Sequence, residues 1–277
     1  MTGPGTLVLV ATPLGNLGDL SPRAIEALRS ADEIWCEDTR RTRVLLTHAG
    51  ITGARLHAVQ AHNEAQAAAR LVEVLRAGRT VAYASDAGMP GVSDPGERLV
   101  AACAAADLPV SVVPGPSAAI GALVVSGLPT ARFAFEGFLA RKGPERRARL
   151  TAIARSDATS IVFEAPSRVA ATIADLAAVC GPERRAAVVR ELTKKFEEVV
   201  RGTLGDLAGI EPRGECVIVV AGAPERAVAD DETIDAALRD EFAAGASARD
   251  AATDVAASLG VAKRRVYERA LEIKPAR

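Results

Sequence analysis

The residues of this chain best suited to chemistry lie in a loop at residues 83–96, with the sequence YASDAGMPGVSDPG. The loop follows an apolar run and combines glycines and prolines with the carboxylates of Asp86 and Asp94. Glycine lets the backbone approach a ligand closely, and proline stiffens the path of the chain. The composition therefore predicts a loop that encloses a small molecule with its backbone.

Three other loops offer polar groups, at residues 12–19, 37–43 and 114–119. None matches G-x-G-x-x-G or G-x-x-x-x-G-K-[ST], so a dinucleotide or nucleoside-triphosphate site is disfavoured. The loops supply backbone polar atoms, carboxylates and the small hydroxyls of Ser85 and Ser117. These groups suit a ligand that carries adenine, ribose and an ammonium or sulfonium group.

Alternating strands and helices are expected to position these loops. Residues 6–12 (TLVLVAT) predict a buried strand, and Ser21 followed by Pro22 predicts the N-cap and first position of a helix. The same strand-to-helix change recurs as far as residue 127. Such alternation indicates a mostly parallel sheet with helices on both faces, and ligands bind such sheets where the strands end.

A second series of strands and helices begins near Arg132. Consecutive strands near its end indicate a mixed or antiparallel sheet. We therefore expect two α/β domains with a ligand cleft between them, plus a small C-terminal helical segment. The expected ranges are 1–118, 119–222 and 223–277, and the last contains two helices around Gly260 with helix-turn-helix spacing.

Composition limits the possible partners. The 277 residues carry a formal net charge of -1 and only 3% aromatic residues. This balance argues against a freestanding nucleic-acid binder and against stacking of bases on several aromatic platforms, so any phosphate contact needs a local basic patch.

Two further features bear on metal sites and location. The four cysteines lie far apart, so a zinc site and a disulfide framework are both disfavoured, and no metal is expected. The N-terminus lacks a basic leader, and its apolar run is too short for a membrane span. A cytoplasmic protein without a membrane partner is the expectation.

Eight motifs occur in order along the chain: TPLGNLGDLSPRA, EDTRRTRVLL, HNE, SDAGMPGVSDPG, VVPGPSAAIGAL, FEGFL, RELTKKFEE and GECVIVV. Together they resemble the ribosomal RNA small-subunit 2′-O-ribose methyltransferase I family. That family lies in the tetrapyrrole-methylase-like superfamily of S-adenosylmethionine (AdoMet) enzymes, the class III AdoMet methyltransferases. The resemblance runs from about Gly5 to Gly222 and extends loosely into the tail.

The resemblance implies a homodimer that binds AdoMet in the cleft between two domains. Two positions depart from the family pattern: Met89 stands where many relatives have Thr, and Gly91 stands where a larger residue is common. Carried over by position, the cofactor-binding residues would be Leu14, Ala87, Gly88, Met89, Val92, Ser117, Ala118, Phe163, Glu164 and Thr193.

The implied reaction is methyl transfer to a ribose hydroxyl. Orientation alone offers effective molarities of about 10⁵–10⁸ M, whereas a general base contributes about 10²–10⁴-fold. A carboxylate beside this weak nucleophile would nevertheless help. Among Glu37, Asp38, Glu64, Asp86 and Glu164, we rank Asp38, Glu64 and Asp86 highest; each also has a plain structural alternative as a helix cap or arginine partner.

The implied substrate is a cytidine ribose in the decoding region of 16S ribosomal RNA. Because the chain has no overall positive charge, we hypothesise that it recognises the folded small subunit rather than naked RNA. A specific target should lie in a loop or splayed segment, because base edges of double-stranded RNA are hard to read. Candidates for contacts to RNA phosphates are Arg40, Arg41, Arg43, Arg141, Lys142, Arg146, Arg147, Lys194 and Lys195.

Two other functions remain open. A tetrapyrrole methylase acting on a corrin precursor would use the same cleft, but the first turn reads PLGN rather than the GPGD expected of that branch. A ligand-sensing regulator that binds DNA through the tail would explain the helix-turn-helix spacing. It would leave the motifs of the second domain unused.

Overall fold

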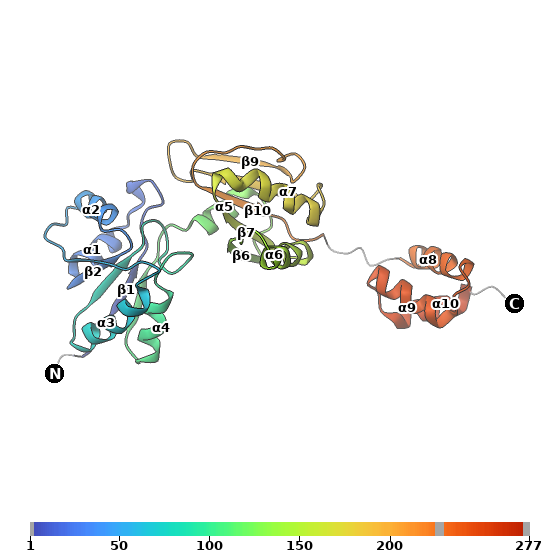
Figure 1. Cartoon of the computed structure of the whole chain (residues 1–277), viewed down its shortest axis with the longest axis horizontal. Coiled ribbons are helices and arrows are strands. Elements are labelled where there is room, and N and C mark those ends of the chain that lie inside the picture. Colours follow the sequence, from blue (N-terminus) through green and yellow to red (C-terminus); the bar gives the residue numbers. More distant parts are fainter. Residues whose placement is uncertain (1–2, 225–229, 274–277) are drawn as a thin grey trace. The chain divides into compact units, whose positions relative to one another are not determined.

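The computed structural model describes residues 3–224 and 230–273. The chain divides into two compact units, Met1–Gly222 and Ala223–Arg277. The first unit contains two five-stranded sheets with helices packed on them, and the second is helical over its described residues (Figure 1). These elements confirm the α/β fold class with a helical segment at the C-terminal end.

The first sheet contains β1 (Leu7–Val10), β2 (Glu33–Cys36), β3 (Leu56–Ala58), β4 (Val81–Ala84) and β5 (Val110–Val113). Its strands are all parallel and follow the order β3-β2-β4-β1-β5. Because parallel strands end at the same edge, the loops that follow β1, β2, β4 and β5 all leave the sheet there. This is the edge at which the sequence predicts a ligand.

Helices cover both faces of this sheet. They are α1 (Pro22–Ser30), α2 (Thr39–His48), α3 (Glu64–Arg76) and α4 (Glu97–Ala105), and a 3-10 turn spans Leu17–Asp19. α1 and α2 pack with Ile34 on one face, whereas α3 and α4 pack with Trp35 on the other, as alternation along a strand requires. α1 begins as predicted, with the Ser21 side chain accepting a hydrogen bond from the backbone N–H of Ala24.

The second sheet contains β6 (Phe133–Phe138), β7 (Thr159–Glu164), β8 (Arg185–Arg190), β9 (Glu198–Thr203) and β10 (Cys216–Val220). Its order is β6-β7-β10-β8-β9; β6 and β7 are parallel and the remaining pairs antiparallel. α5 (Ala118–Ser126) packs with Ile161 on one face. α6 (Pro144–Arg155) and α7 (Val169–Cys180) pack with Val162 on the other. The mixed sheet expected from the sequence is therefore present.

The chain leaves the core of the first sheet after β5, and α5 already packs against the second sheet. The domain boundary expected between residues 118 and 119 stays a prediction, as do the other expected ranges.

The second unit contains α8 (Asp231–Ala243), α9 (Ala248–Leu259) and α10 (Lys263–Ile273). The sequence interpretation counted two helices here and missed α8. Ile234 and Leu238 of α8 pack with Val255 of α9 and Val266 of α10 in a small apolar core. α9 ends at Gly260, which adopts the left-handed conformation that glycine allows. Among the described residues, no helix is long and apolar enough to cross a membrane.

A buried carboxylate links three segments of the first sheet. Glu33, at the start of β2, is 3% exposed. Its Oε2 accepts a hydrogen bond from Trp35 Nε1 at 2.8 Å and lies 3.0 Å from His57 Nε2 on β3. Its Oε1 lies 2.8 Å from the guanidinium of Arg79, just before β4. Burying a charge is costly unless it is paired in this way.

We expect Glu33→Ala to lower the free energy of unfolding by about 3 kcal/mol, because it leaves the Trp35 N–H and the Arg79 charge without their partner. Urea unfolding followed by circular dichroism measures the change. Glu26→Ala is the matched control: Glu26 pairs with Arg29 on the surface of α1, and its loss should cost less than about 0.5 kcal/mol. Equal losses in the two variants would contradict this role for Glu33.

Candidate functional site

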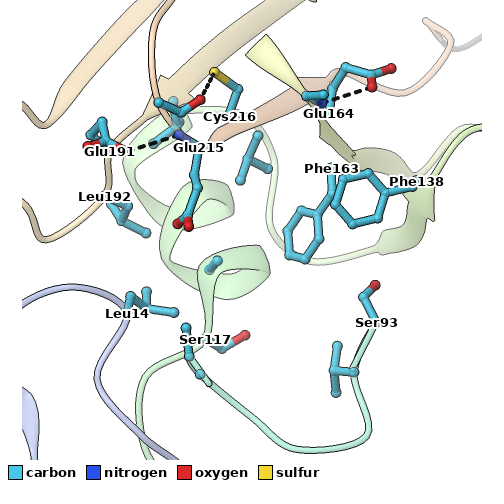
Figure 2. A pocket seen from close by; sticks show the side chains of 18 of the residues that line it. Leu14, Ser93, Ser117, Phe138, Phe163, Glu164, Glu191, Leu192, Glu215 and Cys216 are labelled. Carbon is cyan, nitrogen blue, oxygen red and sulfur yellow. Dashed lines mark hydrogen bonds between the residues drawn. The ribbon is translucent and has the colours of Figure 1, made fainter. Parts of the chain in front are cut away.

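A pocket of about 640 Å³ opens in the first unit, and residues from both sheets line it. The first sheet contributes the turn after β1 and the loop after β4, and the second contributes the ends of β6 and β7, the loop after β8 and the start of β10. Figure 2 shows Leu14 and Ser117 on one side of the pocket, with Leu192 and Glu215 facing them from the other.

Backbone pairing holds the first part of the loop after β4 in place. Thr12 and Gly88 exchange backbone hydrogen bonds of 3.0 Å in both directions. The Thr12 hydroxyl donates to the Ser85 carbonyl at 3.1 Å, and the Ser85 hydroxyl donates to the Gly88 carbonyl at 3.1 Å. Gly88 has a φ of +79°, and a Cβ there would lie 3.1 Å from Leu14 Cδ2. This φ favours glycine, and a Cβ here would also require the Leu14 side chain to shift slightly.

The second part of the same loop is held by Glu64. Glu64 is buried, and its Oε1 accepts hydrogen bonds from the backbone N–H groups of Gly96 at 2.7 Å and Arg98 at 3.0 Å. The carboxylate thus satisfies free donors at the start of α4. Glu64 does not line the pocket. The sequence analysis ranked it as a catalytic base, and the structure gives it an anchoring role instead.

One departure from the family pattern has a conformational reason. Gly91 has a φ of +79°, and its N–H donates to the Pro95 carbonyl at 3.1 Å. Glycine adopts this backbone conformation without strain, whereas a larger residue would be strained. Met89, the second departure, lines the pocket.

The pocket gathers most of the residues expected to bind a cofactor. Thr193 is the exception: it does not line the pocket, although Leu192 and Lys194 on either side of it do. Glu164 lines the pocket, but its side chain turns away (Figure 2) and accepts hydrogen bonds from the Thr172 hydroxyl and the Ala165 N–H. The expected residues among the lining are Leu14, Ala87, Gly88, Met89, Val92, Ser117, Ala118, Phe163 and Glu164.

One side of the pocket is aromatic. The rings of Phe138 and Phe163 lie edge to face with their centroids 5.7 Å apart, and Phe163 meets Phe135 in the same way at 4.8 Å. Phe138 is 60% exposed, so part of its face is open to a ligand. Phe138 is not among the residues expected from the sequence to bind a cofactor, although it belongs to the FEGFL motif and lines the pocket.

The rim of the pocket is acidic. Glu191 accepts hydrogen bonds from Lys194 Nζ and from the Glu215 N–H, both at 2.9 Å. The Glu215 carboxylate lies 3.0 Å from the same Lys194 ammonium, and Figure 2 shows the Glu215 side chain reaching into the pocket. Asp94 also lines the pocket, so the carboxylates of Asp94, Glu191 and Glu215 outnumber the single ammonium group of Lys194, a balance that favours a cationic ligand.

Asp94 is the rim carboxylate without a fixed partner. Within residues 3–224 and 230–273, no hydrogen bond or ion pair is formed by its side chain. Burial, and then the nearby carboxylates of Glu37, Asp86 and Glu215, raise the pKa of Asp94 to about 7. A carboxyl group with this pKa exchanges a proton near neutral pH, as acid–base catalysis requires.

Comparison with known proteins places the chain in a family. A model of the family described as Tetrapyrrole (Corrin/Porphyrin) Methylases matches residues 6–208. Ribosomal RNA small subunit methyltransferase I of Synechocystis sp. is 43% identical over 98% of this chain and 99% of its own length. The protein of the same name from Xylella fastidiosa is 51% identical over 82% of this chain and 85% of its own length. The chain belongs to the methyltransferase I family.

Solved structures agree on the fold. The uroporphyrin-III-C-methyltransferase of Thermus thermophilus is 26% identical, with a TM-score of 0.56 over 78% of this chain and 94% of that chain. A structure of that enzyme complexed with S-adenosyl homocysteine is 21% identical, again with a TM-score of 0.56, over 78% of this chain and 97% of that chain.

In this member of the methyltransferase I family, Asp38 and Asp86, the other two carboxylates predicted to be catalytic, lie outside the large pocket, as Glu64 does. Asp38 caps α2: its Oδ1 accepts from the Arg40 N–H at 2.8 Å, and its Oδ2 lies 2.7 Å from the Arg40 guanidinium. These hydrogen bonds from Arg40 lower the pKa of Asp38 to about 2, too low for an effective base at neutral pH. Asp86 Oδ1 accepts from the Asp38 N–H at 3.0 Å.

The residues expected to contact RNA fall into two exposed groups and a few exceptions. Arg40, Arg41 and Arg43 are exposed on the first turns of α2, and Arg141, Lys142 and Arg147 are exposed at the start of α6. Lys195 is also exposed, and its ammonium lies over the Phe196 ring. Lys194 lines the pocket and pairs with the two glutamates described above.

Arg146 does not belong with these groups. It is 8% exposed, and its guanidinium donates to Asp175, to the Thr172 hydroxyl and to the Ala140 carbonyl. These hydrogen bonds tie α6 to α7, which contains Thr172 and Asp175, and to the loop that precedes α6. An RNA contact at Arg146, expected from the sequence, does not fit this geometry, because the guanidinium is buried and already forms four hydrogen bonds within the protein.

The basic residues of the tail are largely neutralised by neighbours. Arg264 pairs with Glu268, Arg265 with Asp231, and Arg269 with Asp235 and Glu272. A surface arranged in this way offers less unpaired positive charge to a phosphate backbone than the sequence alone suggests. The pairs between α8 and α10 instead help to hold the three helices together.

We expect Asp94→Asn to stabilise the protein increasingly as the pH rises from about 4 to 8. The pKa of Asp94 is raised to about 7 in the folded state, so ionisation in this range costs stability, and asparagine removes that cost. Thermal unfolding at several pH values measures the effect.

Asp206→Asn is the control of opposite sign. A hydrogen bond from the Thr203 N–H lowers the pKa of Asp206, so its carboxylate stabilises the fold above pH 4, and asparagine should slightly lower the melting temperature at pH 8. A stability difference for Asp94→Asn that does not change with pH would rule out the raised pKa.

Proposed function

We propose that the protein is an AdoMet-dependent methyltransferase that methylates the 2′-hydroxyl of a cytidine in the decoding region of 16S ribosomal RNA. It acts in the cytoplasm on the assembled small subunit. The observation that carries the proposal is the large pocket, aromatic on one side and acidic at the rim, in a member of the methyltransferase I family.

The pocket fits AdoMet in size and chemistry. Its volume of about 640 Å³ lies within the range of about 300–1,000 Å³ common for small-molecule sites. The Phe138 and Phe163 rings suit the adenine, and the Ala87–Met89 backbone suits polar atoms of the nucleoside. The rim carboxylates suit the sulfonium and ammonium charges. The solved relative that holds S-adenosyl homocysteine supports this assignment.

AdoMet supplies an electrophilic methyl group, and the protein's task is alignment of the acceptor and removal of its proton. We assign proton removal to Asp94, in place of the three carboxylates ranked from sequence. Asp94 lines the pocket, has no fixed partner among the described residues, and has a pKa of about 7. A base with a pKa near the working pH is the most effective. The Asp94 carboxylate would take the 2′-hydroxyl proton, while AdoMet would supply the methyl group to the ribose oxygen by breaking its S–CH₃ bond and would leave as S-adenosylhomocysteine.

RNA contacts would come from the exposed groups on α2 and at the start of α6. Local positive charge comes from Arg43, Arg141, Lys142 and Arg147, which form no ion pair among the described residues, on a chain whose formal net charge is -1. Arg40 and Arg41 lie beside Asp38 and Asp86 and contribute less. Because the overall field does not attract RNA, recognition depends on the shape of the folded small subunit. Comparable activity on a short naked oligonucleotide would contradict this part of the proposal.

We further propose that the protein works as a homodimer. Val110 and Val112 are exposed on β5, an edge strand, and Ile120 and Val124 are exposed on α5. Exposed apolar side chains on an edge strand are a hazard in a monomer and are usually covered. Light scattering during gel filtration should give twice the mass of the 28.7 kDa chain.

The test of the main proposal is transfer of labelled methyl from AdoMet to three acceptors: small ribosomal subunits lacking this modification, naked 16S RNA and a tetrapyrrole precursor. We expect label on a ribose of the subunit sample, located by nuclease mapping. The tetrapyrrole arm addresses the second candidate function, which the matched family model and the uroporphyrin-III-C-methyltransferase fold favour. Label in the tetrapyrrole alone would overturn the RNA proposal.

We expect Asp94→Asn to lower the rate of methyl transfer by about 10²–10⁴-fold. In the unaltered protein the rate should rise with pH through about 7, since the base must be ionised, and this rise should disappear in the variant. Single-turnover rates across pH 5.5–9 measure both effects. Asp206→Asn should keep the rise, and a pH profile that survives in Asp94→Asn would assign the base elsewhere.

A further inference from the structure

A second pocket, of about 260 Å³, adjoins the large one and shares Leu14 with it. Three segments at the carboxyl edge of the first sheet form it: the turn after β1, the first turns of α2, and the start of the loop after β4. Its other lining residues are Thr12, Pro13, Gly15, Leu17, Arg41, Thr42, Val44, Leu45, Ser85 and Asp86. The methyltransferase reaction proposed above leaves this pocket without a task.

The walls and the edge of this pocket differ in chemistry. Pro13, Leu17 and Val44 present apolar side chains, and the last two are 38% and 62% exposed. Asp86 and Arg41 supply the charged groups. Apolar walls with a few oriented polar groups at one edge are typical of sites for a flat heterocycle.

Asp86 retains free hydrogen-bonding capacity. Its Oδ1 accepts from the Asp38 N–H at 3.0 Å. Its Oδ2 lies 3.6 Å from Arg41 Nη1, which is too long for a hydrogen bond. The Arg41 side chain is 67% exposed, so its other N–H groups are open to a ligand. A carboxylate acceptor and a guanidinium donor thus lie side by side at the edge of the pocket.

We propose that this second pocket receives the base of the nucleotide whose ribose is methylated, and that Asp86 and Arg41 recognise it as cytosine. The inference rests on the proposed function. Cytosine carries an exocyclic amino group, which donates to a carboxylate, beside a ring nitrogen and a carbonyl, which accept from a guanidinium. Uracil presents a carbonyl in place of the amino group, and a carboxylate repels it.

The position of the second pocket suits this role. Ser85 and Asp86 directly precede Ala87 and Gly88, which line the large pocket. Asp86 is also close enough to Asp94 to contribute to its raised pKa. A base held in the second pocket would thus place its own ribose beside the loop after β4, which lines the large pocket.

The experiment compares small subunits reconstituted with 16S RNA that carries either cytidine or uridine at the methylated position. Single-turnover methyl transfer is measured for the unaltered protein, for Asp86→Asn and for Arg41→Ala. Asparagine keeps the acceptor for the Asp38 N–H but replaces Oδ2 by an NH₂ donor, which suits uracil. Arg43→Ala is the matched control, because Arg43 is exposed on the same helix and does not line the pocket.

We expect the unaltered protein to prefer cytidine by roughly 10–100-fold, the discrimination that one pair of base contacts provides. Asp86→Asn should abolish or reverse the preference, and Arg41→Ala should reduce it. Arg43→Ala should leave the preference unchanged. AdoMet affinity, measured by calorimetry, should stay within a few-fold in every variant, which shows that the large pocket is intact.

Two results overturn the inference while leaving the proposed function standing. One is equal methylation of cytidine and uridine by the unaltered protein. The other is an equal loss on both substrates in Asp86→Asn, which would make Asp86 structural only. The absence of any methyl transfer to either subunit by the unaltered protein would instead refute the proposed function.

Discussion

The backbone pairing of Thr12 with Gly88 is the interaction on which both pockets depend. It joins the turn after β1 to the loop after β4, although the two segments lie far apart in the sequence. The pairing fixes Leu14 between the pockets and turns the Ala87–Met89 backbone toward the larger one. Side-chain hydroxyls at Thr12 and Ser85 reinforce it from within the protein, where such hydrogen bonds have no competition from water.

Carboxylates in this region divide into those that hold the structure and those that are free to react. Glu64 anchors the end of the loop after β4, Asp38 caps α2, and Glu164 is bound by Thr172. Each is satisfied by donors that stabilise its charge. Asp94 lacks such donors among the described residues; burial, and then the neighbouring carboxylates, raise its pKa, so it holds a proton more readily. The same environment that destabilises its charge suits it to proton transfer.

The second sheet closes the large pocket with groups of a different kind. It supplies the aromatic rings of Phe138 and Phe163 and the acidic residues around Lys194. The first sheet supplies backbone atoms, Asp94 and the whole of the second pocket. Under the proposed function, AdoMet would lie between an apolar, acidic wall and a polar loop, and the RNA would approach over the first sheet.

The sequence by itself determined the order of strands and helices as far as residue 222, though not α8, together with the N-cap at Ser21, the strand-to-helix loops and, through its motifs, the family. Hydrophobic periodicity and turn residues act locally, so they can be read without a structure.

Only the tertiary structure decided which carboxylate is free to accept a proton. Asp38, Glu64, Asp86 and Asp94 look alike in sequence, and their roles depend on donors brought from distant segments, such as the N–H groups of Gly96 and Arg98 at Glu64. Arg146 shows the same limit. Its basic run predicts an exposed charge, but its guanidinium is buried and donates hydrogen bonds to Asp175 and Thr172 on a neighbouring helix.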